Sequence, residues 1–85
     1  MKEIDIGKVT HYYTRISVAV LSLTDELMIG DTIHILGRIT DHIQRVGSME
    51  IDHVQVQSVS PGSEVALLVD DYVRQGDSIF KIIDV

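Results

Sequence analysis

The sequence predicts an all-β fold, a small closed or nearly closed structure of six or seven strands. A turn phrase, in which an apolar residue precedes a Gly-Asp or Gly-Ser pair and an alternating apolar run follows, occurs at residues 27–35, 73–82 and, in a weaker copy, 59–67. Glycine adopts the positive φ that such turns often demand, and the Asp or Ser after it can bond neighbouring backbone groups. The alternation that follows is typical of a strand with one buried face.

Length and charge narrow the class of protein. The 85 residues suffice for one domain, residues 1–85, and the absence of cysteine excludes disulfides and thiol chemistry. Seven Lys and Arg stand against thirteen Asp and Glu, a net charge of −6 that disfavours binding to nucleic-acid phosphates. The amino terminus does not resemble a signal peptide, and no segment approaches the roughly 18 apolar residues of a membrane span. We therefore expect a cytoplasmic protein without a membrane partner.

The first two strands carry the strongest local signals. The apolar phase shifts across Gly7-Lys8, which predicts a β-bulge that helps the sheet bend. The next strand, residues 15–23, is apolar on both faces, with Ile16, Val18 and Val20 on one face and Ala19, Leu21 and Leu23 on the other. Both faces are therefore expected to be covered, one by the barrel interior and the other by terminal segments or a partner.

Further strands are expected over residues 32–36, 40–46, 49–59, 64–69 and 78–85, with a phase change near His53. Pro61-Gly62 marks a turn, where the fixed φ of proline is useful and its missing donor is harmless. Residues 25–29 are the only segment that could form even a single helical turn.

Histidines are the candidate metal ligands: His11, His34, His42 and His53. None of their spacings is typical of a structural zinc site. His34 and His42 could face each other across a hairpin with Asp41 or Asp52 nearby, although exposed strand residues are the simpler interpretation. Neither a Gly-x-Ser-x-Gly elbow nor a glycine-rich phosphate loop occurs. We expect no catalytic residues, no metal and no cofactor.

The segment His11-Tyr12-Tyr13-Thr14-Arg15 is the first part of a candidate binding surface. It gathers aromatic, imidazole and guanidinium groups at one strand end, and these groups are favoured in contact hot spots and in base stacking. The alternative is that the aromatic side chains plug the mouth of the barrel.

Five segments together resemble a known family: Ile6–Tyr12, Val18–Val20, Leu27–Ile33, Ser48–His53 and Val73–Asp77. They resemble the second domain of translation GTPases such as elongation factor Tu. They are still more similar to the carboxy-terminal barrel of the bacterial collagenase-like peptidase family and to small stand-alone proteins of that type. The resemblance covers nearly the whole chain and implies a Greek-key β-barrel like domain 2 of the elongation factor.

In elongation factor Tu this barrel helps to hold the aminoacylated 3′ end of transfer RNA. The resemblance implies that Glu50 matches the factor's glutamate, and it adds Glu50, Asp52 and His53 to the candidate binding surface. Asp52 and His53 stand where the factor has an aromatic residue and an arginine, and Glu64 stands where it has an asparagine. Compared with the factor, this chain therefore lacks an aromatic ring and a cation and has an additional carboxylate. These differences disfavour a pocket for aminoacylated RNA. In the peptidase family the catalytic part lies outside the barrel, so no enzymatic activity is implied.

Three functions follow from these observations. The first is a non-enzymatic, translation-factor-like adaptor that binds a protein or ribonucleoprotein partner, with a homo-oligomer also possible. The second is an RNA-binding accessory domain, in which Tyr12, Tyr13 and Arg15 would stack on unpaired bases. The third, ranked last, is a small enzyme or metal protein using His34, His42 and Asp52.

Overall fold

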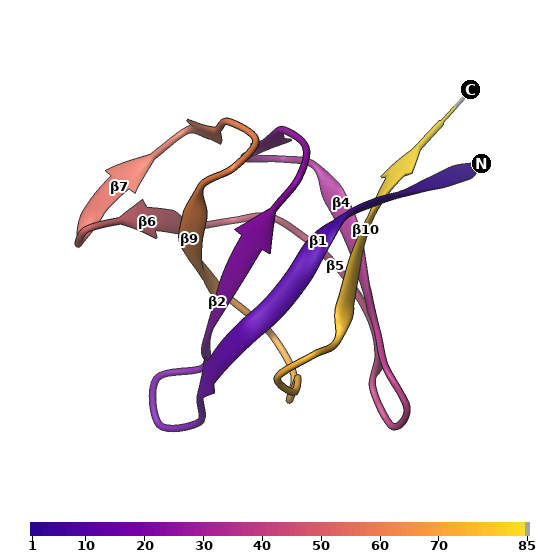
Figure 1. Ribbon diagram of the computed structural model, residues 1–85, viewed down its shortest axis with the longest axis horizontal. Coiled ribbons are helices and arrows are strands. Elements are labelled where there is room, and N and C mark those ends of the chain that lie inside the picture. The colour runs from indigo at the N-terminus through magenta and orange to yellow at the C-terminus, as the bar shows by residue number, and fades with distance from the viewer. Residues whose placement is uncertain (85) are drawn as a thin grey trace.

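The computed structural model describes residues 1–84 and confirms the all-β class, with no helix in that range (Figure 1). The strands are β1 (Lys2–Tyr13), β2 (Val18–Leu23), β3 (Leu27–Met28), β4 (Thr32–Leu36), β5 (Asp41–Arg45), β6 (Met49–Ile51), β7 (Val54–Val56), β8 (Ser58–Val59), β9 (Glu64–Leu68) and β10 (Ser78–Ile83). Val85, the predicted end of the last strand, lies outside the described residues. No helix in residues 1–84 has the length and hydropathy needed to cross a membrane.

Eight strands form one antiparallel sheet in the order β5-β4-β10-β1-β2-β9-β6-β7, and β3 pairs separately with β8. The sheet curls around a single core, and its two edge strands, β5 and β7, are not hydrogen-bonded to each other (Figure 1). The ladder therefore remains open, which corresponds to a nearly closed structure rather than a complete barrel. The first and last long strands, β1 and β10, pair from Lys2 opposite Ile83 to Lys8 opposite Ser78.

The buried side chain of Gln44 joins the edge strand β5 to the end of β9. Its Nε2 donates to the carbonyl of Leu68, at the end of β9, at 3.1 Å. Its Oε1 accepts from the backbone N–H of Asp70 at 2.8 Å and from Nε2 of His42 at 2.8 Å. A side-chain amide offers both donors and an acceptor, so it satisfies two backbone groups that have no strand partner there.

All three predicted glycine turns are present, and their glycines have the expected positive φ: +93° at Gly30, +87° at Gly62 and +92° at Gly76. Each glycine N–H donates to the carbonyl of a buried residue in another segment, and the N–H of that residue donates to the carbonyl after the glycine. The pairs are Gly30-Asp31 with Val46, Gly62-Ser63 with Leu23 and Gly76-Asp77 with Val9, at N···O distances of 2.8–3.1 Å. Each copy of the repeated sequence phrase therefore makes the same kind of tertiary contact.

The carboxylates of the two Gly-Asp copies also act as predicted. Asp31 Oδ2 accepts from the N–H of Met28 at 2.9 Å, and Asp77 Oδ2 accepts from the N–H of Arg74 at 2.8 Å. In each copy the aspartate side chain accepts a hydrogen bond from the backbone N–H three residues earlier. This bond spans the turn and stabilises it.

The core is aliphatic, and the inner face of β2 contributes Ala19, Leu21 and Leu23, each at most 2% exposed. The other face of β2 is not fully covered by the described residues of this chain, and the expected cover by a partner stays a prediction. Val18 and Val20 are only partly buried, and Ile16 is 62% exposed because residues 14–17 form a turn and the strand begins at Val18. One apolar sheet face is thus left open.

The expectation of one strand over residues 49–59 is also wrong. Asp52 and His53, with φ of 51° and 65°, form a two-residue turn between β6 and β7. Positive φ at both central residues is typical of a type I′ turn, for which Asn-Gly is the usual signal. The segment considered for a helical turn contains β3 instead.

The predicted β-bulge at Gly7 is confirmed, because the β1–β10 register shifts between Asp5 and Gly7. A Cβ at Gly7 would overlap the backbone carbonyl oxygen of Ser22 on β2. We therefore expect Gly7→Ala to lower the free energy of unfolding by about 1–3 kcal/mol, since the contact is with backbone that cannot rotate away. Urea denaturation followed by circular dichroism measures the change.

Gly47→Ala is the matched control, because a Cβ there has no atom within 4 Å and its φ is not positive. We expect it to change the free energy of unfolding by about 0.5 kcal/mol at most. Equal stabilities for the two variants would contradict the close approach of β1 and β2 at Gly7.

Candidate functional site

An open apolar groove of about 630 Å³ lies on the outer face of β2 and β9. Register places Val18 opposite Leu68 and Val20 opposite Ala66, and directly opposed residues share one face of an antiparallel pair. The residues between them point into the core. The apolar lining is Tyr13, Ile16, Val18, Val20, Ala66 and Leu68, and the polar lining is Ser48, Glu50 and His53.

Two hairpins form the walls of this groove. The β1–β2 hairpin supplies Tyr13, 52% exposed, and Ile16, and the β6–β7 hairpin supplies Glu50 and His53. In Figure 1 the β6–β7 hairpin projects to the left of β9, and the β1–β2 loop lies at the lower left. Between the walls the small side chain of Ala66 leaves the floor hollow.

The groove is continuous with an acidic end. A second hollow of about 240 Å³ shares Val20, Glu50, His53 and Ala66 with the first, and it adds Asp52 and Glu64 to the lining. Glu50 lies directly opposite Ala66 in the β6–β9 pair. The outer face therefore changes from apolar to acidic within a few residues.

The structure brings together four residues of the predicted binding surface. Tyr13, Glu50 and His53 line the groove, and Asp52 lines its acidic end. His53 and Asp52 occupy the two-residue turn, so their positions depend on a hairpin that the sequence pattern did not reveal.

The other three predicted residues are placed differently. His11 lies beside Tyr13, with ring centroids 6.4 Å apart, and Arg15 is exposed in the β1–β2 turn. Tyr12 packs against the core cluster and meets Tyr72 edge-on at 6.0 Å. Tyr12 thus has the packing role that the barrel-mouth alternative assigned to the aromatic residues.

Sequence reasoning missed Ala66 and Leu68 as groove residues. The sequence predicted residues 64–69 as an apolar strand, without an outward face shared with β2. The signal was available, since Glu64, Ala66 and Leu68 alternate with the buried Val65 and Leu67. An apolar residue at an outward position next to the apolar outer face of β2 indicates a shared surface.

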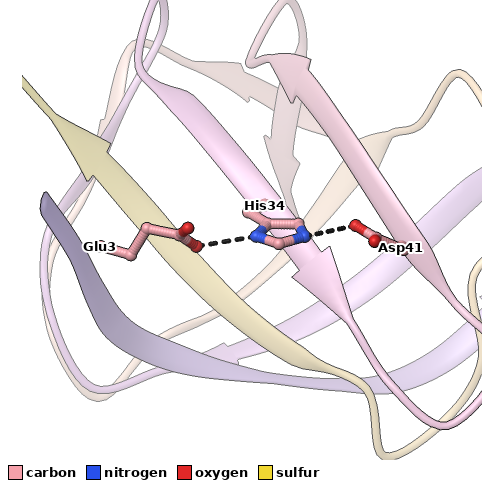
Figure 2. A network of polar contacts seen from close by, with 3 residues as sticks. All are labelled: Glu3, His34 and Asp41. Carbon is pink, nitrogen blue, oxygen red and sulfur yellow. Dashed lines mark hydrogen bonds and ion pairs between the residues drawn. The ribbon is translucent and has the colours of Figure 1, made fainter. Parts of the chain in front are cut away.

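A separate polar network joins three strands around His34 on β4 (Figure 2). Its Nδ1 donates to Glu3 Oε1 at 2.7 Å, and its Nε2 donates to Asp41 Oδ1 at 2.6 Å. A carboxylate faces each ring nitrogen, so the two contacts favour the doubly protonated imidazolium form of His34. The hydrogen bond to Glu3 is the largest cause that raises the pKa of His34 above its ordinary 6.5. Burial lowers this pKa, but the two carboxylates together outweigh the effect of burial.

The structure does not place His34 and His42 face to face. His34 lies opposite Ile43 and His42 opposite Ile35, so the two imidazoles are on opposite faces of the β4–β5 hairpin. Of the two aspartates considered beside them, Asp41 contacts His34. Across residues 1–84, no group of three or more His, Asp or Glu side chains is arranged to hold a metal ion.

The His34 network predicts a pH-dependent contribution to stability. Because the pKa of His34 is higher in the folded chain, the contribution is complete below the unfolded pKa of about 6.5 and is lost as the pH rises through the folded pKa. We expect the stability difference between the wild type and His34→Gln to shrink by up to about 1 kcal/mol between about pH 6 and pH 9, since both carboxylates are solvent-accessible. Urea denaturation across this range measures it.

His11→Gln is the control, because His11 is exposed and contacts an aromatic ring rather than a carboxylate in the described part of the chain. Any pH trend that the two variants share does not come from the contacts of His34 with Glu3 and Asp41. A pH-independent difference for His34→Gln would show that the imidazolium bridge adds nothing in solution.

Fold and groove together define a class: a small all-β module with one open, partly apolar sheet face. No protein-family model matches the chain. It is 38% identical over 82 residues to an uncharacterized protease of Methanocaldococcus jannaschii, a match that covers 95% of this chain and 20% of that protein. The chain thus spans about a fifth of the length of this curated relative.

Solved structures share the fold. The C-terminal domain of a U32 peptidase family protein from Geobacillus thermoleovorans superposes with a TM-score of 0.86 at 16% identity, covering 93% of this chain and 92% of that domain. Its selenomethionine variant gives 0.84 at 16% identity, covering 89% and 96%. The predicted likeness to a carboxy-terminal domain of a peptidase family is supported, whereas the likeness to elongation factor Tu stays a prediction.

Proposed function

We propose that this chain is a non-catalytic binding module that holds a segment of a protein partner in the outer groove. The observation that carries the proposal is the open apolar face of β2 and β9. Ile16 and Leu68, 62% and 49% exposed, flank the half-buried Val18 and Val20. Covering such a contiguous apolar surface removes it from water, which is the main favourable term in protein association.

The groove also has the side-chain types that bind polypeptides well. Tyr13 offers a large ring with a polar tip at the rim, and tyrosine is enriched where binding energy concentrates. Ala66 leaves a hollow in the floor that a partner's aliphatic side chain can fill. Glu50 and His53 on the wall can hydrogen-bond to a partner backbone that lies along the groove.

Catalysis by this module is disfavoured by the location of its linked ionisable groups. General acid–base chemistry needs such groups positioned where a substrate can lie. The hydrogen-bonded set Glu3, His34 and Asp41 lies on β1, β4 and β5, and none of these residues lines the groove. The protease relative is about five times as long as this chain, so the rest of its length is where we expect any catalytic residues.

RNA binding in a translation-like accessory role is the alternative from the sequence, and the charge of the groove disfavours it. Glu50, Asp52 and Glu64 at one end of the groove would repel phosphates. The names of the relatives point instead to peptidases, whose substrates are polypeptides. A protein adaptor is therefore the function that we favour.

Selection from a random peptide display library tests the proposal. We expect the wild-type module to enrich a defined set of peptides. Ala66→Leu fills the hollow, and Leu68→Asp places a charge on the apolar lining. Each variant should therefore weaken binding of the selected peptides by about tenfold or more, a loss of about 1.4 kcal/mol. Titration of a selected peptide by fluorescence anisotropy measures the affinity.

Ile43→Asp is the matched control, because Ile43 is 56% exposed on β5 and does not line the groove. It should leave the peptide affinity unchanged. No enrichment on the wild type, or equal losses in Leu68→Asp and Ile43→Asp, would refute the groove as the binding site. Single-stranded RNA bound more tightly than about 10⁻⁶ M at low salt would favour the RNA alternative.

A further inference from the structure

We infer that the groove selects an extended peptide segment with apolar residues at alternate positions and a lysine or arginine two residues further along. This inference rests on the proposed function and specifies the chemistry of its ligand. It follows from the order in which apolar and acidic side chains lie along one strand.

The outer face of β9 presents Leu68, Ala66 and Glu64 in succession, because alternate residues of a strand share a face. At 3.3–3.4 Å per residue, Leu68 and Glu64 lie roughly 13 Å apart along the strand. An extended ligand spans the same distance in about four residues. Its side chains at positions i and i+2 would meet the apolar half of the groove, and the side chain at i+4 would meet Glu64.

The acidic end is formed by three carboxylates, two from the β6–β7 hairpin and one from β9. Glu50 is half-buried on β6, and Asp52 and Glu64 are exposed. Neither hollow is lined by a lysine or arginine within residues 1–84. Arg15 lies in the β1–β2 turn next to Ile16, at the apolar end of the groove. The groove is therefore polarised along its length.

This polarity matches a basic ligand residue and rejects an acidic one. Complementary charge at a binding surface raises association rates and suppresses partners of the wrong sign. The net charge of −6 on the whole chain acts in the same direction at longer range. Because Asp52 and Glu64 are exposed, their effect must weaken as salt is added.

Synthetic fluorescent peptides test the inference. The first carries two leucines at alternate positions and a lysine two residues further on, in a Gly-Ser background, and a second has the reverse order to allow either chain direction. Two matched peptides replace the lysine by glutamate or the leucines by serine. We expect at least one lysine peptide to bind about tenfold or more tightly than both matched peptides at about 50 mM salt, with the lysine–glutamate ratio falling at about 500 mM.

Charge-removing variants locate the effect on the protein. Glu64→Gln and Glu50→Gln should each lower the affinity for the lysine peptide several-fold and leave the affinity for the glutamate peptide equal or higher. Glu26→Gln removes the same charge from an exposed residue outside both hollows, and it should have no effect.

Equal binding of lysine and glutamate peptides, or equal effects of Glu64→Gln and Glu26→Gln, would overturn the basic-residue inference and leave a groove that binds apolar peptides. If no designed peptide binds, the display-selected peptides decide, because the inference requires a basic residue at that spacing in them. A module that neither binds the designed peptides nor enriches any from the library would overturn the proposed function itself.

Discussion

The architecture depends on three glycine turns that each exchange two backbone hydrogen bonds with a buried aliphatic residue. The turns end one residue before β4, β9 and β10 begin, at Thr32, Glu64 and Ser78. The residues that they bind, Val46, Leu23 and Val9, are at most 2% exposed. Each exchange thus satisfies buried backbone groups and at the same time sets where a strand starts over the core.

The second constraint is the side chain of Gln44, which joins the edge strand β5 to the end of β9. The strands β5 and β9 are not paired with each other, and the buried amide supplies hydrogen bonds to the backbone of Leu68 and Asp70. A buried polar side chain costs free energy unless it is satisfied, and this one has partners for both its nitrogen and its oxygen. The result is a cylinder-like core that leaves β6 and β7 free to project as a hairpin and form one wall of the groove.

The sequence predicted the elements whose signals are local. Gly30, Gly62 and Gly76 marked turns because few other residues tolerate positive φ, and Gly7 marked the bulge because the apolar alternation slips there. Asp52-His53 escaped because neither residue is a strong type I′ signal and apolar residues continue on both sides. Local sequence signals were therefore sufficient to predict the conformation at four glycines. They did not predict the Asp52-His53 turn, which contains no glycine.

The candidate site was only partly predictable, since it depends on contacts between segments far apart in the chain. The double-sided apolarity of β2 was visible, but which face is open depends on the pairing of β2 with β9 and on the β6–β7 hairpin. The same holds for His34, whose two carboxylate partners, Glu3 and Asp41, come from strands on either side of it in space. Sequence reasoning considered Asp41 beside a metal and had no reason to consider Glu3, 31 residues away.

The pairing of β1 with β10 brings the beginning and end of the described chain to the same corner (Figure 1). The groove lies at the opposite end of β1, where Tyr13 meets the β1–β2 turn. A polypeptide fused to either terminus would therefore be joined to the module at this corner, away from the groove. The module can therefore be spliced as a cassette into a surface loop of another protein, because its two junctions are neighbours and its exposed face points elsewhere.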